Sequence, residues 1–262
     1  MNRTDERVGL VGFGRFGRAL ASLAEGTGLS WSAWDPHAEI PHARRAATSE
    51  SLASGSSVIA LCVPVSSLEE ALAPIVHVVR PDQLVIDVAS VKVGPEGVLA
   101  RALARRAPWC ATHPLFGPVS LSRGERPLRV VVCPNTEHPR AAPRARALFE
   151  RLGCTVHEMS ADAHDRLMAQ THALAFFVAK AMIELDAGAG SECVPPSFRA
   201  MAQTIDTVRA DAGHLFTLIQ NENPHAAEAR RRLIDALVRI DTDLTRAASG
   251  AAPARPLDIS ER

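Results

Sequence analysis

The chain has 262 residues, 47% of them hydrophobic and 22% charged, which is typical of a globular protein and excludes a disordered or fibrous one. Its 29 Lys and Arg residues are balanced by 29 Asp and Glu residues, so no net charge attracts nucleic acid or an anionic membrane. Tyrosine is absent, and this excludes dehydrogenase chemistry in which a phenol passes the proton.

The first 160 residues alternate short apolar runs with amphipathic segments, the pattern of parallel strands connected by helices. The expected strands cover residues 8–11, 31–34, 58–63, 84–88, 109–111, 129–133 and 155–158. Helical periodicity is found in residues 16–25, 68–78, 95–106 and 140–151. Residues 1–160 are therefore expected to form an α/β domain with one doubly wound, mostly parallel sheet.

From residue 161 the apolar spacing follows helices alone. Helices are expected over residues 163–185, 198–219 and 224–247, with a loop rich in Gly, Ser and Pro over residues 186–196. This pattern predicts an all-helical domain over residues 161–248 and a flexible tail over residues 249–262. Too few residues remain to cover the broad apolar faces of these helices, so we expect the domain to pair with a second copy in a homodimer.

A glycine-rich motif, Gly12-Phe13-Gly14-Arg15-Phe16-Gly17, follows the first expected strand and opens the first expected helix. In this context the glycines permit a tight turn, a close approach of a pyrophosphate and close packing of helix on strand. We therefore expect a Rossmann domain that binds a dinucleotide. Its expected cofactor-binding residues are Gly12, Phe13, Gly14, Arg15, Phe16, Gly17, Asp35, Val63 and Pro64.

Asp35 ends the second expected strand, where a carboxylate accepts hydrogen bonds from the adenosine ribose and repels a 2'-phosphate. NAD is therefore favoured over NADP as the cofactor. His37, Arg44 and Arg45 follow within reach of a 2'-phosphate, so NADP stays open as the alternative.

Ligands of doubly wound sheets bind outside the carboxyl ends of the strands, and Ser90 and His113 follow two of the later expected strands. An imidazole titrates near neutrality, so His113 suits the removal of a hydroxyl proton as hydride leaves the same carbon. The alternatives are an imidazole that caps a backbone group for His113 and a helix cap for Ser90. Lys92 either pairs with an acid or contacts the substrate.

Three motifs together resemble the prephenate/arogenate dehydrogenase family. They are Asp87-Val88-Ala89-Ser90-Val91-Lys92 with Gly94-Pro95, then His113-Pro114-Leu115-Phe116-Gly117-Pro118, then His164-Asp165-Arg166-Leu167-Met168-Ala169. Their order and spacing are similar to the family over residues 7–225. The resemblance implies a Rossmann domain joined to a helical dimerisation domain, and the oxidation of a 4-hydroxycyclohexadienyl carboxylate with NAD(P) and loss of CO2.

The resemblance also implies roles for individual residues. His113 and Ser90 are the expected catalytic residues, because the family places the histidine against the 4-hydroxyl of the substrate and orients this pair through a hydrogen bond from the serine. The expected substrate-binding residues are Ser90, His113 and Gly117, together with His172 and Arg209, which lie near two positions where the chain departs from the family.

Two positions depart from the family. Where it presents a second histidine to the substrate this chain has Phe176, and His172 lies one helical turn earlier on the same face. Where the family holds a substrate carboxylate with an arginine, the ungapped register gives Thr207, with Arg209 two positions later on a different face. Either a slip of the register restores the match to the arginine, or the substrate side chain differs from the pyruvyl or alanyl group.

No metal site is expected, because the five cysteines form no CxxC pair and the other histidines show no paired ligand spacing. These histidines are expected at the surface or as caps: His37, His42, His77, His138, His157, His164, His214 and His225. The sequence shows neither the pattern of a signal peptide nor an apolar stretch near the roughly 20 residues of a membrane span. We therefore expect a cytoplasmic protein.

The leading hypothesis is the NAD-dependent oxidative decarboxylation of prephenate, arogenate or a close cyclohexadienyl analogue to an aromatic product. One alternative is an enzyme of specialised metabolism that acts on amino-deoxyprephenate or another modified substrate. The others are a β-hydroxyacid or imine reductase with the same domain plan, and a non-catalytic regulator that binds NAD.

Overall fold

The computed structural model describes residues 6–190, 193–210 and 214–249. The chain divides into two compact units, Met1–Met168 and Ala169–Arg262. Among the described residues, no helix combines the length and the apolar character needed to cross a membrane. The expected tail, apart from Ser249, lies outside the described residues.

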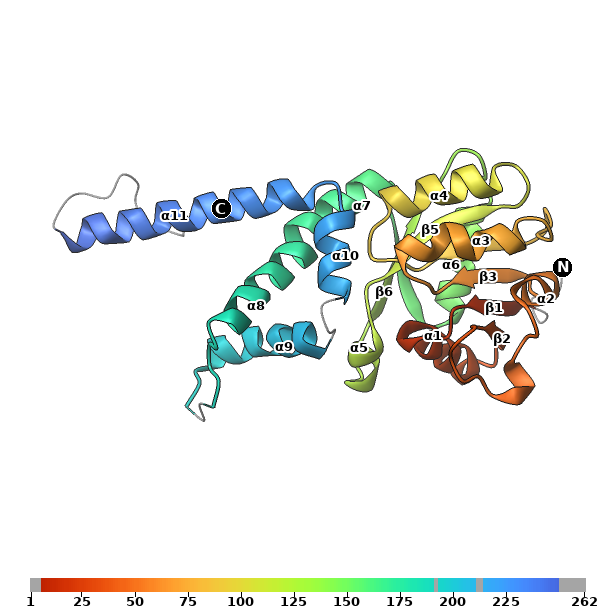
Figure 1. Ribbon diagram of the computed structural model, residues 1–262, viewed down its shortest axis with the longest axis horizontal. Helices are drawn as coiled ribbons and strands as arrows, with labels where there is room; N and C mark the ends of the chain where they lie inside the picture. The colour runs from red at the N-terminus through yellow and green to blue at the C-terminus, as the bar shows by residue number, and fades with distance from the viewer. Residues whose placement is uncertain (1–5, 191–192, 211–213, 250–262) are drawn as a thin grey trace. The chain divides into compact units, whose positions relative to one another are not determined.

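The first unit is built on a seven-stranded sheet with the order β2-β1-β3-β4-β5-β6-β7 (Figure 1). Its strands are β1 (Arg7–Val11), β2 (Ser30–Trp34), β3 (Val58–Leu61), β4 (Leu84–Asp87), β5 (Trp109–Pro114), β6 (Leu128–Cys133) and β7 (Cys154–Glu158). Neighbouring strands are parallel except for the antiparallel pair β5 and β6. The structure therefore confirms the doubly wound, mostly parallel sheet.

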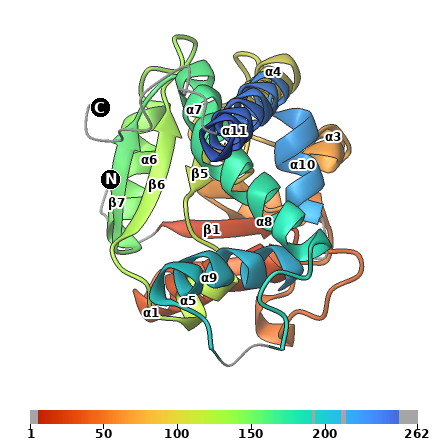
Figure 2. The ribbon, with the colours of Figure 1, turned by 90° about the vertical axis from the view of Figure 1, so that its left-hand side faces the viewer.

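Helices cover both faces of this sheet, which explains why its strands are nearly continuous apolar runs. The helices are α1 (Arg15–Gly26), α2 (Ser49–Gly55), α3 (Leu68–Ile75), α4 (Val93–Leu103), α5 (Pro118–Ser122), α6 (Ala141–Arg151) and α7 (Ala161–Met168). In β3, Val58 and Ala60 belong to the apolar cluster with α1 and α6, and Ile59 and Leu61 belong to the cluster with α2, α3 and α4. Figure 2 shows α6 alongside β6 and β7.

The units divide after Met168, whereas the change in sequence pattern places the boundary near residue 160. The difference is α7, which has the sequence pattern of the helical region but belongs to the first unit. Ala161 is part of the apolar cluster that includes α4, and Asp165 accepts hydrogen bonds from the backbone at the start of α4. These contacts hold α7 to the sheet domain.

The second unit is helical, as expected. It comprises a π-helical turn (Ala169–Ala173), α8 (Leu174–Glu184), α9 (Pro196–Ala210), α10 (His214–Glu222) and α11 (Ala226–Ala248). α8 and α9 pack against each other (Figures 1 and 2), and their apolar cluster includes Phe176, Ile205 and Ile219. The π-helical turn interrupts the helix that the periodicity predicts over residues 163–185. Two helices, α9 and α10, lie where one is expected over residues 198–219.

Candidate active site

The register of the sheet aligns the strand ends that carry the expected site residues. Val11 pairs with Leu61, Leu61 with Asp87, and Asp87 with Ala111. These four paired residues mark one edge of the sheet. Shortly after them in the chain come the glycine motif, the loops after β3 and β4, and His113. The chain runs from β1 to the edge strand β2 and returns to β3 beside β1, so this edge is at the topological switch point where such sheets bind ligands.

The three glycines of the motif have different surroundings. Gly12 has φ +96°, and a Cβ there would lie 2.6 Å from the carbonyl oxygen of Cys62. A Cβ on Gly17 would lie 2.4 Å from the carbonyl oxygen of Gly12. A Cβ on Gly14 would have no described atom within 4 Å, so this position is open where a phosphate would approach. No described side chain caps α1, and its first N–H groups therefore suit the pyrophosphate of a dinucleotide.

Asp35 lies beside this loop and accepts three backbone hydrogen bonds. Its carboxylate accepts from Phe13 at 2.7 Å and from His37 and Ala38 at 2.8 Å each. Burial acts to raise the pKa of Asp35, but these hydrogen bonds outweigh it and leave the pKa below its ordinary value. The carboxylate is therefore ionised near neutral pH and stands where adenosine ribose hydroxyls are expected.

Of the cations near Asp35, Arg44 is engaged elsewhere: it donates to the carbonyl oxygen of Trp31 at 3.2 Å and lies over the Trp31 ring. That ring stacks on Phe13 with centroids 5.6 Å apart. His37 and Arg45 are exposed. Phe13 and Arg44 are therefore both held by contacts with Trp31.

The other expected cofactor residues lie around the same loop. Val63 is half-buried against the position that a Gly12 Cβ would take, and the exposed Pro64 precedes a short 3-10 turn. Arg15 begins α1 and is exposed. The ring of Phe16 lies 6.1 Å from that of Phe116, which brings the glycine motif and the motif of His113 together.

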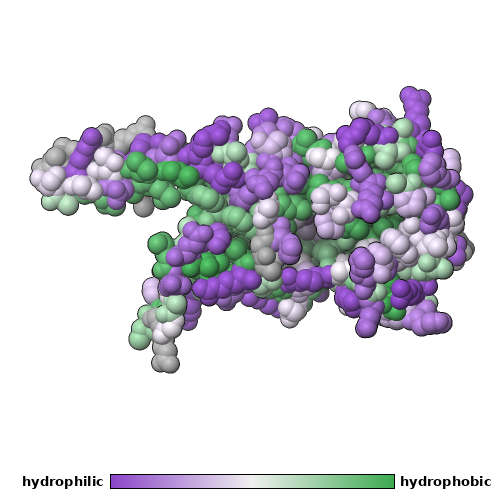
Figure 3. Space-filling model, in the orientation of Figure 1, coloured by the Kyte–Doolittle hydropathy of each residue, from purple (hydrophilic) through white to green (hydrophobic). Residues whose placement is uncertain are grey.

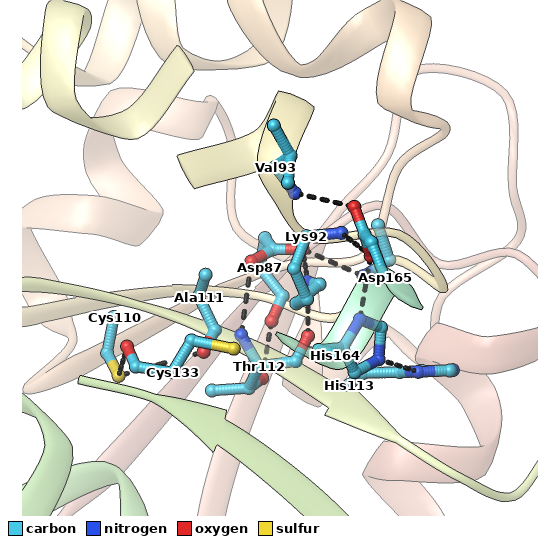
Figure 4. Close-up of polar contacts among 11 residues, drawn as sticks. Asp87, Lys92, Val93, Cys110, Ala111, Thr112, His113, Cys133, His164 and Asp165 are labelled. Carbon is cyan, nitrogen blue, oxygen red and sulfur yellow. Dashed lines mark hydrogen bonds and ion pairs between the residues drawn. The ribbon is translucent and has the colours of Figure 1, made fainter. Parts of the chain in front are cut away.

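His113 is buried near the end of β5, with 4% of its surface exposed. Its Nδ1 lies 2.8 Å from Nε2 of His164, and the two rings meet edge to face (Figure 4). The alternative considered for His113 is an imidazole that caps a backbone group. Its Nδ1 instead contacts the ring of His164. This ring pair was not expected from the sequence.

His164 is fully buried, which corrects the expectation that it lies at the surface or serves as a cap. Its Nδ1 lies 2.7 Å from Oδ1 of Asp165. That carboxylate accepts hydrogen bonds from the backbone N–H groups of Lys92 at 2.8 Å and Val93 at 2.9 Å. Asp165 therefore caps the N-terminus of α4, where the helix dipole favours an anion.

Lys92 is also fully buried and pairs with an acid, which decides between its two expected roles. Its ammonium contacts the carboxylate of Asp87 and the carbonyl oxygen of Thr112. Asp87 accepts further hydrogen bonds from the N–H groups of Ala89 and Thr112. This buried ion pair fixes the backbone that immediately precedes His113.

Ser90 is half-buried in the loop between β4 and α4. Among the described residues, Nδ1 of His113 is paired with His164 and not with Ser90. The N-cap residue of α4 is Lys92, so Ser90 is not the helix cap considered from the sequence. Gly117 is the N-cap residue of α5, directly after the loop that follows His113.

The remaining expected substrate residues belong to the second unit. The rings of His172 and Phe176 lie 4.5 Å apart, edge to face, so the two residues share one face of the helix as the spacing predicts. Thr207 donates its hydroxyl proton to the carbonyl oxygen of Gln203, and Arg209 is exposed near the end of α9.

The sequence missed two residues of the site, His164 and Asp165. Their signal was the His164-Asp165 motif, which already belonged to the family resemblance. Its importance is hidden because the contact between His164 and His113 spans 51 residues and requires α7 to pack on α4.

Comparisons with known proteins show similarity to prephenate and arogenate dehydrogenases. Residues 38–157 match the family model described as prephenate dehydrogenase, nucleotide-binding domain. A 4-amino-4-deoxyprephenate dehydrogenase of Streptomyces pristinaespiralis is 33% identical over 194 residues, covering 71% of this chain and 63% of that protein. Arogenate dehydrogenase 1 of Arabidopsis thaliana is 26% identical over 91% of this chain and 39% of that protein. The chain thus spans less than two thirds of either relative.

A solved structure supports the fold over nearly the whole chain. Prephenate dehydrogenase from A. aeolicus, in complex with hydroxyphenyl propionate and NAD+, has a TM-score of 0.73 at 18% identity and covers 93% of this chain and 92% of its own. The matching family model, the order of the motifs and this common fold agree with one another. Residues 38–157 therefore match the nucleotide-binding domain of prephenate dehydrogenases, and the chain shares the fold of a solved prephenate dehydrogenase over most of its length.

Proposed function

We propose that this protein catalyses the NAD-dependent oxidative decarboxylation of a cyclohexadienyl carboxylate to an aromatic product. The observation that carries the proposal is the buried imidazole of His113 at the edge of the sheet that also bears the glycine motif. The similarity of residues 38–157 to the nucleotide-binding domain of prephenate dehydrogenases, and the relative named for 4-amino-4-deoxyprephenate, support the same reaction.

The chemistry requires a group that handles one proton at ring carbon 4 of the substrate. When bound, the nicotinamide of NAD accepts the hydride from this carbon. His113 takes the proton from the hydroxyl or amino group on the same carbon, so an N–H bond forms as the O–H or N–H bond of the substrate breaks. Loss of CO2 then makes the ring aromatic, and His113 returns the proton to the oxygen or nitrogen, so no net proton is consumed.

The substrate candidates are prephenate, arogenate and 4-amino-4-deoxyprephenate. The relative from Streptomyces pristinaespiralis is named for the amino-deoxy compound. Phe176 and Thr207 occupy the positions where the resemblance implies a histidine and an arginine, and these two differences favour a modified substrate as the second candidate. We therefore keep the amino group as an alternative to the hydroxyl at carbon 4.

NAD is favoured over NADP because the ionised carboxylate of Asp35 would repel a 2'-phosphate. Arg44, one of the cations considered for such a phosphate, is bound to Trp31. The cytoplasmic location and the absence of nucleic-acid and membrane partners stay predictions.

The test is a set of NAD reduction assays with purified protein. Prephenate, arogenate and 4-amino-4-deoxyprephenate are supplied separately, and NADH is followed by its absorbance. We expect turnover with at least one of them, and we expect His113→Asn to lower kcat by about 10²- to 10⁴-fold because the base is lost. The affinity for NAD, measured by calorimetry, should stay unchanged in this variant.

The other outcomes separate the alternatives. Turnover of a 3-hydroxy acid or an imine, with none of the dienes, would identify a reductase. Binding of NAD without turnover of any compound would identify a regulator. Full activity of His113→Asn would remove His113 from the reaction.

We also propose that the second unit forms a homodimer through α11. Five large apolar residues of this helix are between 46% and 59% exposed: Ile234, Leu237, Val238, Ile240 and Leu244. Figure 3 shows apolar surface along this helix. A second copy would remove this surface from water, and a two-fold axis would let the same face serve both partners.

A further inference from the structure

The buried chain of contacts from Asp165 through His164 to His113 assigns the protons of both imidazoles. Asp165 is held by the N–H groups of Lys92 and Val93 and by the dipole of α4, all of which favour its anionic form. An ionised carboxylate only accepts hydrogen bonds, so Nδ1 of His164 must donate to it.

This assignment continues to the second ring. A neutral His164 with its proton on Nδ1 has an acceptor at Nε2. The 2.8 Å contact to Nδ1 of His113 then requires that His113 donates its own proton from Nδ1. The lone pair of a neutral His113 consequently lies on Nε2.

We propose that His164 and Asp165 are positioning residues that hold His113 in the tautomer with its basic lone pair on Nε2, and that stabilise the positive charge when His113 takes the substrate proton. This inference rests on the proposed function, because it gives the pair a role in that reaction. The proton taken from the substrate is held on Nε2 of His113, and not passed on to His164, until His113 returns it to the oxygen or nitrogen of the product. The hydrogen bonds from His113 to His164 and from His164 to Asp165 connect the positive charge on His113 to the negative charge of Asp165, which stabilises it.

The electrostatic surroundings favour this charge. Asp165 is the anion of α7 that faces the two rings through His164. At the start of α4 and the end of β4, the charges of Lys92 and Asp87 compensate each other. Glu96 of α4 interacts electrostatically with Lys92, Asp165 and Asp87, and burial raises its pKa against the opposing effect of Lys92. Among these described groups, Asp165 is the one joined to the two rings by hydrogen bonds.

The first test variant is Asp165→Asn. Its amide can donate to Nδ1 of His164, which moves the proton of His164 to Nε2 and the proton of His113 to its own Nε2. We expect kcat to fall by about 10²- to 10⁴-fold, as for a general base in the wrong tautomer. The NAD affinity should stay unchanged, and the thermal midpoint reports any loss of the α4 cap. The control is Asp162→Asn, on the same helix but in an exposed ion pair with Arg166, which should keep the wild-type kcat.

The second test compares two replacements of His164. Gln keeps an acceptor for Nδ1 of His113 but breaks the link to Asp165, and Leu removes both. We expect kcat of His164→Gln to exceed that of His164→Leu by about 10-fold or more. An anion raises the pKa of a nearby imidazole, so losing the link should move the acid limb of the kcat/KM profile of His164→Gln down by about one pH unit. A residue that only packs would not move this limb.

Nitrogen-15 NMR of the NAD-bound enzyme without substrate gives a readout that needs no turnover. We expect the proton of neutral His113 on Nδ1 in the wild type and on Nε2 in Asp165→Asn. A wild-type proton on Nε2, or an unmoved acid limb in His164→Gln, overturns the inference. Absence of turnover with every diene overturns the proposed function instead, and the tautomers still test the assignment on their own.

Discussion

Lys92 and Asp87 are a fully buried ion pair next to the strand that carries His113. Removing both charges from water costs several kcal/mol per ion, and the mutual attraction offsets this only with good geometry and further hydrogen bonds. Both conditions are met, because Asp87 also accepts from Ala89 and Thr112 and Lys92 also contacts the carbonyl oxygen of Thr112. The pair therefore positions the end of β5. Substitution of either residue would leave the other charge buried without a partner.

Lys92→Met is expected to lower the free energy of unfolding by about 3–5 kcal/mol, because it leaves the carboxylate of Asp87 buried and uncompensated. Urea denaturation followed by circular dichroism measures this change. The matched control is Lys180→Met, since Lys180 forms an exposed pair with Glu184 whose loss should change stability by less than about 1 kcal/mol. Equal effects of the two substitutions would contradict the structural role of the buried pair.

The sequence around a residue predicts some members of the site and not others. The glycine motif, Asp35 and His113 are each placed by the strand that precedes them, so their shared edge follows from the parallel pattern alone. His164 has no such signal in its own neighbourhood, because a histidine at that point of an amphipathic helix is equally compatible with the surface. Its burial depends on α7 capping α4 through Asp165, a contact between distant segments.

In the loop between β1 and α1, one glycine is required by the packing of the fold and another by the expected binding of the cofactor. Gly17 is needed by the packing of α1 against the loop, since a Cβ there would lie 2.4 Å from a backbone oxygen. Gly14 faces space in which no described atom lies within 4 Å. The same residue type therefore serves the fold at one position and the cofactor at the other.

Gly17→Ala and Gly14→Ala should consequently differ in what they damage. We expect Gly17→Ala to lower the free energy of unfolding by about 1–3 kcal/mol through overpacking. Gly14→Ala should change stability by less than about 1 kcal/mol but weaken NAD binding about 10-fold or more, because its methyl group occupies the approach of the pyrophosphate. Urea denaturation and calorimetric titration with NAD measure the two effects. A Gly14→Ala variant with unchanged NAD affinity would contradict the assigned position of the pyrophosphate.

The elements that the sequence did not predict are short or irregular. α2 (Ser49–Gly55) and α5 (Pro118–Ser122) are too short to show a clear helical period, although Thr48 caps α2 through a capping box. The π-helical turn at Ala169–Ala173 shifts the register of the residues that follow, which an unbroken period of 3.6 cannot show. The strands and the helices α1, α4, α6 and α11 lie where their apolar period predicts them, because the burial of one face repeats at the period of the element.

α11 has two different halves within the second unit. Its first residues pack with α8, α10 and the π-helical turn, and Ala226 and Ala229 are buried there. Further along, Leu233, Leu237, Ile240 and Leu244 follow one another at intervals of four, three and four residues, the spacing of a coiled-coil seam. Because the last three of these residues are at least half exposed, the described chain does not cover this seam by itself.

Charges on this seam should therefore separate the proposed dimer. We expect the wild type to sediment as a dimer at micromolar concentration, and Leu237→Glu combined with Ile240→Glu to sediment as a monomer, because paired carboxylates would then be buried at the interface. The control is Arg239→Glu, which places the same side chain on the opposite face of α11 and should leave the dimer intact. The thermal midpoint of the double variant should also become independent of protein concentration, since dissociation no longer accompanies unfolding. A monomeric wild type, or a double variant that still dimerises, would show that α11 is not the interface.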